Sequence, residues 1–423
     1  MKTMTGLDKP TRRRFIARAA ALAAATVTAG PALAQSTIQD IISAPQRGSW
    51  DDQFDAESSR SVAKTATRFP ITSAGTIGFV ERSIFDYQNI VASGGWPIVP
   101  ATKKLRMGDS EPEVRLLRQR LIASGDLDRN AGLSNAFDSY VDGAVKQFQA
   151  RHGLPPDGVL GSYTYQALNV SAAVRLGQLE TNLVRLRSMS GFLGDRYVMV
   201  NIPAAQIEAV ENDRVVLRHT AIVGKIDRQT PILNSKIHQI ILNPYWTSPR
   251  SIIQKDIVPL MRKDPTYLAR NSIRLFDGQG NEVAPESIDW NAEKAPNLMF
   301  RQDPGKGNAM ASTKINFNNP HAVYMHDTPQ QGVFNKLLRF ESSGCVRVQN
   351  VRDLNTWLLR DTPGWDRQTM EAVIASGENT EIDLSDPVPV YFTYFTAWAS
   401  EDGVVQFRDD VYQRDGVDEL ALR

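Results

Sequence analysis

The sequence has few of the residues that build disulfide networks and metal cages. Among 423 residues it has one cysteine, Cys345, and five histidines. One cysteine excludes an intrachain disulfide and a cysteine-rich zinc site, and five scattered histidines offer little for a metal cage, so we expect neither a metal nor another cofactor. Cys345 is therefore either a small buried hydrophobic residue or a nucleophile.

Long apolar runs and blocks of positive charge are also scarce. No run of 18 apolar residues follows the N-terminal stretch, and no basic block follows Arg18. The first absence argues against a membrane-spanning helix and the second against a nucleic-acid partner, because neutralising phosphates needs clustered cations. The 42% apolar and 22% charged composition is that of a globular protein, and 423 residues suffice for two or three domains.

The N-terminus has the pattern of an export signal. Residues 11–16, Thr-Arg-Arg-Arg-Phe-Ile, form a twin-arginine pattern, followed by an alanine-rich stretch and the small-residue cleavage pattern Ala32-Leu33-Ala34. We expect a signal peptide over residues 1–34 and a mature protein outside the cytoplasm; the alternative is an alanine-rich first helix of the fold. Residues 1–34 hold six lysines and arginines against one aspartate, so their removal takes the formal charge from +1 to −4.

The next segments have helical character. Residues 35–100 are polar and mixed, with a helix expected near 81–92, and form either a scaffold for later domains or partly a tether. Over residues 101–171 apolar residues recur at helical spacing, which predicts a module of three short helices. Ser110 and Glu113 have the spacing of a capping box before the first of them. Residues 172–194 then continue as a helical linker.

From residue 195 to 423 the pattern changes to the alternation of β-strands. Strands are expected at residues 197–202, 206–210, 215–218, 237–242, 321–326 and 388–396, the last with 404–407 as its candidate partner. Residues 250–310 interrupt this pattern with a charged, proline-punctuated and partly helical stretch. Insertions of this length are commonly functional, often lids.

Two short stretches carry the candidate chemistry. If residues 321–326 form a strand, Tyr324 and His326 share one face, beside the turn that begins at Asp327. Cys345 lies 19 residues after His326 and directly follows Gly344. A cysteine nucleophile needs a base, a positive environment and amide donors for an oxyanion. His326, Arg347 and the amides around Gly344 and Cys345 provide these groups, and a main-chain carbonyl near Asp327 is a candidate to orient the histidine.

These residues resemble the L,D-transpeptidases with a YkuD-type catalytic domain, in particular the large Gram-negative members that carry a peptidoglycan-binding module. The matching stretches are Asn243-Pro244-Tyr245-Trp246, Tyr324 with His326-Asp327-Thr328-Pro329, and residues 342–348, Ser-Ser-Gly-Cys-Val-Arg-Val. The helical module is similar to the three-helix peptidoglycan-binding module through residues 105–109, 145–149 and 157–161.

The resemblance implies a multidomain α+β fold: a mostly β catalytic domain with a helical lid or capping insertion, and the three-helix module. It also implies a role for the matching residues, and the twin-arginine signal predicts a periplasmic location. Cys345 would be the nucleophile, His326 the base, and Gly344 and the Asp327 main chain parts of the catalytic site. Arg347, Tyr324, Ser343 and Trp246 would contact substrate, although for Trp246 core packing is an equal alternative.

The implied reaction joins two peptidoglycan stem peptides. Cys345 would take the acyl group of a donor tetrapeptide with loss of D-alanine, and an amine of a second stem would accept it, giving a 3→3 cross-link. Water or an envelope protein remain alternative acceptors, a non-catalytic wall-binding protein is a further alternative, and carbapenems are expected covalent inhibitors. Two departures stand out: Ser343 replaces the histidine common in the family, although the large subgroup shares this serine, and residues 309–312, Ala-Met-Ala-Ser, lack an expected glycine.

Overall fold

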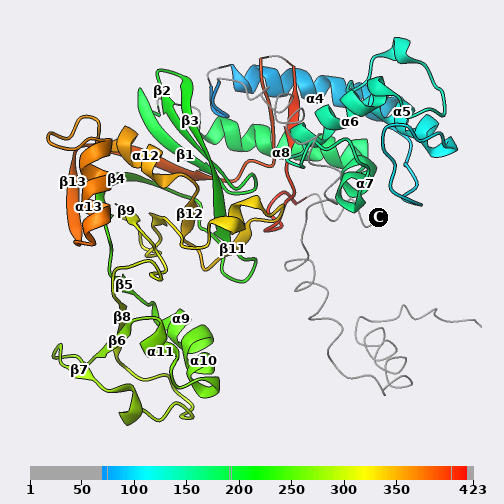
Figure 1. The fold of residues 1–423 in the computed structure, drawn as a ribbon. Helices are drawn as coiled ribbons and strands as arrows, with labels where there is room; N and C mark the ends of the chain where they lie inside the picture. Colours follow the sequence, from blue (N-terminus) through cyan, green and yellow to red (C-terminus); the bar gives the residue numbers. More distant parts are fainter. Residues whose placement is uncertain (1–68, 74, 190, 192, 402, 417–423) are drawn as a thin grey trace, which may run out of the picture. The chain divides into compact units, whose positions relative to one another are not determined.

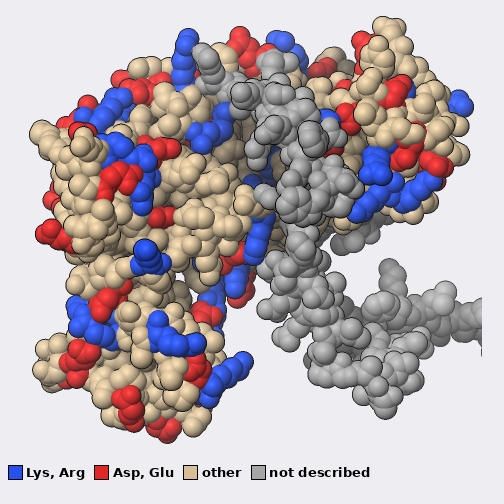
Figure 2. Space-filling model, viewed as in Figure 1, with Lys and Arg blue, Asp and Glu red and all other residues tan. Residues whose placement is uncertain are grey.

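The computed structural model describes residues 69–73, 75–189, 191, 193–401 and 403–416 (Figure 1). The signal peptide expected at residues 1–34, and residues 35–68 of the expected scaffold segment, lie outside the described residues. Within the described part no helix combines the length and the apolar character needed to cross a membrane. In the view of Figure 2, basic and acidic side chains are interspersed over the visible face.

Three helices and a short 3-10 turn form the helical module. Their bounds are α5 Pro112–Ala123, η3 Arg129–Ala131, α6 Ser139–Arg151 and α7 Ser162–Asn169. Leu117, Val145 and Phe148 pack in its core. The expected capping box is wrong: Glu111 occupies the N-cap of α5, Ser110 pairs with Ala136 in a β-bridge, and the Glu113 carboxylate accepts a hydrogen bond from Thr102 instead. Pro112 begins this helix, because the first helical position needs no N–H donor.

Two longer helices, α4 Thr76–Ala92 and α8 Ala172–Ser188, pack against each other. The helix expected near residues 81–92 thus begins earlier, at Thr76. Leu179 and Leu186 of α8 share a buried cluster with Val80 of α4 and with Tyr197 and Met199 of the sheet that follows. The segments expected as scaffold and linker therefore contribute a packed layer through α4 and α8.

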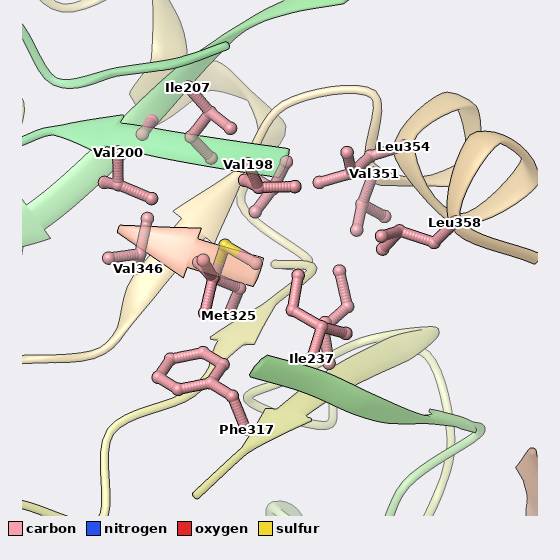
Figure 3. Packing of buried hydrophobic residues seen from close by; sticks show 14 of the residues in the cluster. Val198, Val200, Ile207, Ile237, Phe317, Met325, Val346, Val351, Leu354 and Leu358 are labelled. Atoms are coloured by element: carbon pink, nitrogen blue, oxygen red, sulfur yellow. The ribbon is translucent and has the colours of Figure 1, made fainter. Parts of the chain in front are cut away.

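The largest sheet in the described residues has nine strands in the order β11-β3-β12-β10-β9-β4-β13-β1-β2. Their bounds are β1 Arg196–Asn201, β2 Gln206–Glu211, β3 Arg214–Gly224, β4 Leu233–Leu242, β9 Thr313–Phe317, β10 Met325–His326, β11 Phe340–Ser342, β12 Val346–Val348 and β13 Thr380–Thr393. The short η6 Gln331–Asn335 lies between β10 and β11, and α12 Val351–Leu359 and α13 Arg367–Ser376 precede β13. Figure 3 shows Met325 and Val346 of this sheet packed among aliphatic residues that include Leu354 and Leu358 of α12.

Two strand predictions are corrected by the structure. Of residues 321–326 only Met325 and His326 are in a strand, because the Asn319 side chain accepts from the N–H groups of His321 and Val323 and holds a turn there. Ala322 in that turn has φ +53°. In the second case residues 404–407 do not pair with the 388–396 run: β15 Val405–Phe407 pairs with β14 Ala397–Ala399.

Residues 246–302, which cover most of the expected 250–310 insertion, form a separately packed subdomain, which we call the capping subdomain. It contains the helices expected from the sequence and also a four-stranded sheet in the order β5-β8-β6-β7. Its elements are β5 Trp246–Thr247, α9 Arg250–Ile252, the π-helical turn η4 Ile253–Ile257, α10 Val258–Lys263, α11 Tyr267–Arg270, β6 Ile273–Phe276, β7 Glu282–Val283, η5 Pro285–Ser287 and β8 Met299–Gln302. Ile257, Leu268 and Phe300 belong to a hydrophobic cluster of its own. The expected multidomain α+β fold is thus confirmed, with a capping insertion that is mixed rather than helical.

Candidate active site

One row of polar side chains crosses three neighbouring strands. In the strand register, His326 of β10 is the partner of Lys314 on β9 and of Arg347 on β12. Met325, Val346 and Val348 are buried in the hydrophobic core. Because successive strand residues face opposite sides of a sheet, His326 and Arg347 face away from that core, and Lys314 lies beside His326 in the register. The structure therefore flanks the histidine with two cations.

Cys345 lies one position before β12, next to Tyr324. The N–H of Val346 donates to the carbonyl of Tyr324 at 3.1 Å, which holds the two chain segments side by side. The ring centroids of Tyr324 and His326 are 5.6 Å apart, and Nε1 of Trp246 donates to the Tyr324 hydroxyl at 3.2 Å. Tyr324, His326, Cys345, Arg347 and Trp246, which the sequence singled out, thus lie together.

The surroundings of His326 determine which ring nitrogen carries the hydrogen and whether the ring is charged. Its Nδ1 lies 2.5 Å from the main-chain oxygen of Asp327, and a carbonyl only accepts, so Nδ1 carries the hydrogen and Nε2 is left as the basic nitrogen. Burial, followed by the charges of Arg347 and Lys314, lowers the pKa of His326 to about 3. The imidazole is therefore neutral at physiological pH, which is the state a general base requires.

The Asp327 carboxylate fixes the turn that holds this carbonyl. One oxygen accepts from the Ser312 hydroxyl at 2.6 Å, and the other accepts from the Thr328 N–H at 2.8 Å and the Gln331 side chain at 3.0 Å. The carboxylate thus acts on the turn, and the main chain of Asp327 contacts the histidine. The sequence alone did not point to Ser312 or Gln331.

The Cys345 thiol is protonated at rest. Burial raises its pKa, against opposing effects from hydrogen bonds with Tyr324 and from the charges of Lys314 and Arg347. Burial also lowers the pKa of Lys314 and of Arg347. Lys314 Nζ lies 4.7 Å from the centroid of the Tyr324 ring, and Nε of Arg347 is buried without a hydrogen-bond partner among the described residues. A nucleophile with these neighbours needs a base to take its proton as it attacks.

The loop of residues 343–345 has a defined internal geometry. Gly344 has φ +112°, a conformation that favours glycine. Its N–H donates to the Ser342 hydroxyl at 3.2 Å, and that hydroxyl donates to the carbonyl of Cys345 at 2.5 Å. Of the two amides expected to bind an oxyanion, that of Gly344 is therefore already engaged. The N–H of Cys345 donates to no acceptor in the described ranges.

The loop between β3 and β4, residues 225–232, braces the 343–345 loop. The Thr230 hydroxyl donates to the carbonyl of Gly344 at 2.8 Å and accepts from the N–H of Gly224 at 2.9 Å. Nη1 of Arg228 donates to the Ser343 hydroxyl at 3.0 Å and also pairs with Asp256 of the capping subdomain at 2.6 Å. Arg228, Thr230 and Lys314 escaped the sequence analysis, since only the strand register and the folded loop bring them to the site.

Comparisons with known proteins match two family models to this chain. Residues 195–375 match the family model of the L,D-transpeptidase catalytic domain, YkuD, and residues 110–168 match that of the "Putative peptidoglycan binding domain". A curated Haemophilus influenzae protein named "Putative L,D-transpeptidase" is 35% identical over 246 residues, which are 58% of this chain and 49% of that protein. An N-acetylmuramoyl-L-alanine amidase of Mycobacterium tuberculosis is 42% identical over 82 residues, 17% of this chain and 20% of the amidase.

This chain thus spans about half the length of the first relative and a fifth of the second. Among solved structures, an L,D-transpeptidase from Xylanimonas cellulosilytica is 17% identical, with a TM-score of 0.22, over 70% of this chain and 99% of its own. Another from Stackebrandtia nassauensis is 13% identical, with a TM-score of 0.24, over 70% and 96%.

Proposed function

We propose that this protein is a peptidoglycan L,D-transpeptidase with Cys345 as its nucleophile, because residues 195–375 match the family model of the L,D-transpeptidase catalytic domain and residues 110–168 match that of a peptidoglycan-binding domain. The observation that carries the proposal is the state of His326: neutral, with Nδ1 on the Asp327 carbonyl, and grouped with Cys345 around Tyr324. A partly buried thiol and a neutral imidazole that both lie beside Tyr324 are suited to acyl transfer.

In the first step Cys345 attacks the carbonyl that precedes the terminal D-alanine of a donor tetrapeptide. The thiol proton passes to Nε2 of His326 as the carbon–sulfur bond forms, and we assign the Cys345 N–H as a donor to the resulting oxyanion. When the carbon–nitrogen bond breaks, His326 returns the proton to the departing amino group of D-alanine. A thioester between Cys345 and the donor peptide remains.

In the second step the side-chain amine of another stem attacks the thioester. It loses a proton to His326, the carbon–sulfur bond breaks, and the Cys345 sulfur recovers the proton, which leaves a 3→3 cross-link. Lys314 and Arg347 carry positive charge beside the site, and we assign them to the carboxylates of the stem peptides. The peptidoglycan-binding domain would bring the wall polymer to the same molecule.

The location and the inhibitors belong to the same proposal. The twin-arginine pattern at Arg12 and Arg13 supports export to the periplasm, where the substrate would lie. The acyl-enzyme chemistry supports acylation of Cys345 by carbapenems. Envelope-protein amines are further candidate acceptors.

The test uses the purified protein with disaccharide-tetrapeptides, and Cys345→Ala in parallel. Products are followed by mass spectrometry. We expect a dimer that lacks one D-alanine, formed by the parent and absent with Cys345→Ala. If the parent forms tripeptide but no dimer, the protein is a carboxypeptidase rather than a transpeptidase. If the parent and Cys345→Ala form the same products, Cys345 is not the nucleophile.

A further inference from the structure

Arg228 joins the capping subdomain to the 343–345 loop. Its guanidinium binds Asp256 through two hydrogen bonds, Nη1 to Oδ2 at 2.6 Å and Nη2 to Oδ1 at 3.1 Å. The same Nη1 donates to the Ser343 hydroxyl at 3.0 Å, two residues before Cys345. Ser343 is where the sequence departs from the common family pattern, and the structure gives its hydroxyl a partner. One side chain thus connects a surface of the insertion with the chain segment that carries the nucleophile.

The 225–232 loop that carries Arg228 is fixed to the main sheet. A Cβ on Gly224 would clash with the carbonyl oxygen of Arg228, so this loop folds directly over the end of β3. The Tyr412 hydroxyl donates to the carbonyl of Gly224 at 2.5 Å and accepts from the N–H of Thr230 at 3.3 Å. Because Thr230 also holds Gly344, the Arg228 main chain and the 343–345 loop are anchored to the same support.

Asp256, by contrast, belongs to a body with its own core. The capping subdomain packs its own hydrophobic cluster and connects to the main sheet through two segments, residues 243–245 and 303–312. Separately packed bodies joined by short segments are suited to hinge motion. Asp256 lies in the π-helical turn η4, a local irregularity that is frequent at functional positions. The Arg228–Asp256 pair is therefore a contact across which the subdomain can close and open.

The Arg228–Asp256 ion pair, which we call a latch, is weak enough to form and break reversibly. The Asp256 side chain is 41% exposed and that of Arg228 is 15% exposed, and ion pairs so close to solvent are weak enough to break repeatedly. The second contact of the subdomain near the site, Trp246 with Tyr324, lies at β5, where the chain enters the subdomain. Of these two contacts, the one made by Arg228 reaches further into the capping subdomain, at Asp256.

From these contacts we propose that Arg228 is a specificity-determining positioning residue: it latches the capping subdomain over the Cys345 thioester and so favours an amine acceptor over water. The inference rests on the proposed function and adds the control of its second step. A closed site excludes water until an amine attacks the thioester, whereas an open site allows hydrolysis to compete with the amine. The latch touches the capping subdomain and Ser343, and it forms no bond to the reacting atoms.

The experiment measures the ratio of hydrolysed tripeptide to cross-linked dimer from disaccharide-tetrapeptides. We expect Arg228→Gln and Asp256→Asn each to raise this ratio by about threefold or more, with the double variant no worse than either single variant, because both remove one contact. Acylation of Cys345 by a carbapenem, followed by intact mass, should stay within about twofold in Asp256→Asn, since the first step keeps its residues.

The matched control is Arg270→Gln, which breaks an exposed arginine–aspartate pair, Arg270 with Asp264, inside the capping subdomain. Its product ratio should equal that of the parent. An unchanged ratio in Arg228→Gln and Asp256→Asn would overturn the latch and leave the transpeptidase standing. Parallel loss of both products and of carbapenem acylation in Asp256→Asn would also overturn it, because the pair would then only support the nucleophile. Absence of any Cys345-dependent product in the parent would remove the proposed function itself.

Discussion

At the scale of single residues, the two cations beside His326 have a chemical consequence. Burial alone favours the neutral imidazole, and the charges of Arg347 and Lys314 disfavour its protonated form further, so that the pKa of His326 falls to about 3. The same burial raises the pKa of the Cys345 thiol. The resting pair is therefore thiol and imidazole rather than thiolate and imidazolium, and the proton moves during attack.

This state predicts a flat pH profile for carbapenem acylation. A histidine with the ordinary pKa of about 6.5 would lose its basic form by about tenfold at one unit below that value. With the pKa of His326 near 3, the acylation rate should change little between about pH 7.5 and pH 5.5. The prediction is checked by quenching the reaction at set times at each pH and measuring the acylated fraction by intact mass.

The variant Lys314→Met tests whether the positive charge of Lys314 lowers the pKa of His326. Lys314→Met removes one of the cations that lower the pKa of His326, so the pKa rises and the acid limb of the profile should move toward neutral pH. A tenfold fall per pH unit in the parent protein would contradict the neutral pair and indicate that a pre-formed thiolate reacts.

At the scale of elements, the site depends on a loop that contributes nothing to the chemistry directly. The 225–232 loop connects β3 and β4 and supports the 343–345 loop through Thr230. The Thr230 side chain is fully buried, and its hydroxyl satisfies one main-chain donor and one main-chain acceptor. Buried main-chain groups that lose a partner are costly, which makes this threonine a structural requirement of the site.

We predict that Thr230→Val destabilises the protein by about 1–3 kcal/mol, because the N–H of Gly224 and the carbonyl of Gly344 lose their partner. Acylation of Cys345 should slow with it, as the 343–345 loop loses its brace. Thr230→Ser keeps the hydroxyl and should retain most of both properties. Urea unfolding and carbapenem acylation measure the two effects; equal values for the valine and serine variants would show that the hydroxyl is unimportant.

At the scale of the whole molecule, the helical module packs against the hairpin β14–β15. The ring of Phe407 stacks on His152 with centroids 5.6 Å apart, and it also contacts Tyr87 of α4. Nη1 of Arg151 donates to the carbonyl of Val405 at 3.2 Å, and Nη1 of Arg408 donates to that of Arg151 at 3.0 Å. The module therefore shares its packing with α4 and β15.

Removing the central ring should uncouple these parts. Phe407 is 1% exposed, and truncation of a buried phenylalanine costs about 3–5 kcal/mol. We predict that Phe407→Ala gives a separate, earlier unfolding transition of the helical module in calorimetry. Phe85→Ala is the control, because Phe85 on α4 is 63% exposed and its loss should change little. A single transition in Phe407→Ala at an unchanged temperature would show that the hairpin does not couple the module.

The order of residues along the chain was enough to predict the helices of the module and the strands β1–β4, β13 and β15, because the spacing of apolar residues at periods of 3.6 and 2 is a local signal. The strands of the capping subdomain and the short strands β9, β11, β12 and β14 were missed. It also singled out Cys345 and His326, since a lone cysteine and a histidine in distinctive stretches are visible without a fold. Local pattern misled at residues 321–324, where the Asn319 side chain replaces a strand by a turn. In the 309–312 stretch, which lacks an expected glycine, Ala311 has a left-handed φ of +46°.

Only the tertiary structure decided which distant groups act on the pair. Lys314 reaches His326 through the pairing of β9 with β10, and Arg228 and Thr230 reach the 343–345 loop from more than 100 residues earlier in the chain. Strand order and register are set by how whole faces bury their apolar residues, so no local window contains them. For the same physical reason the sequence determined which residues are chemically capable, whereas the fold determined their charge state and their support.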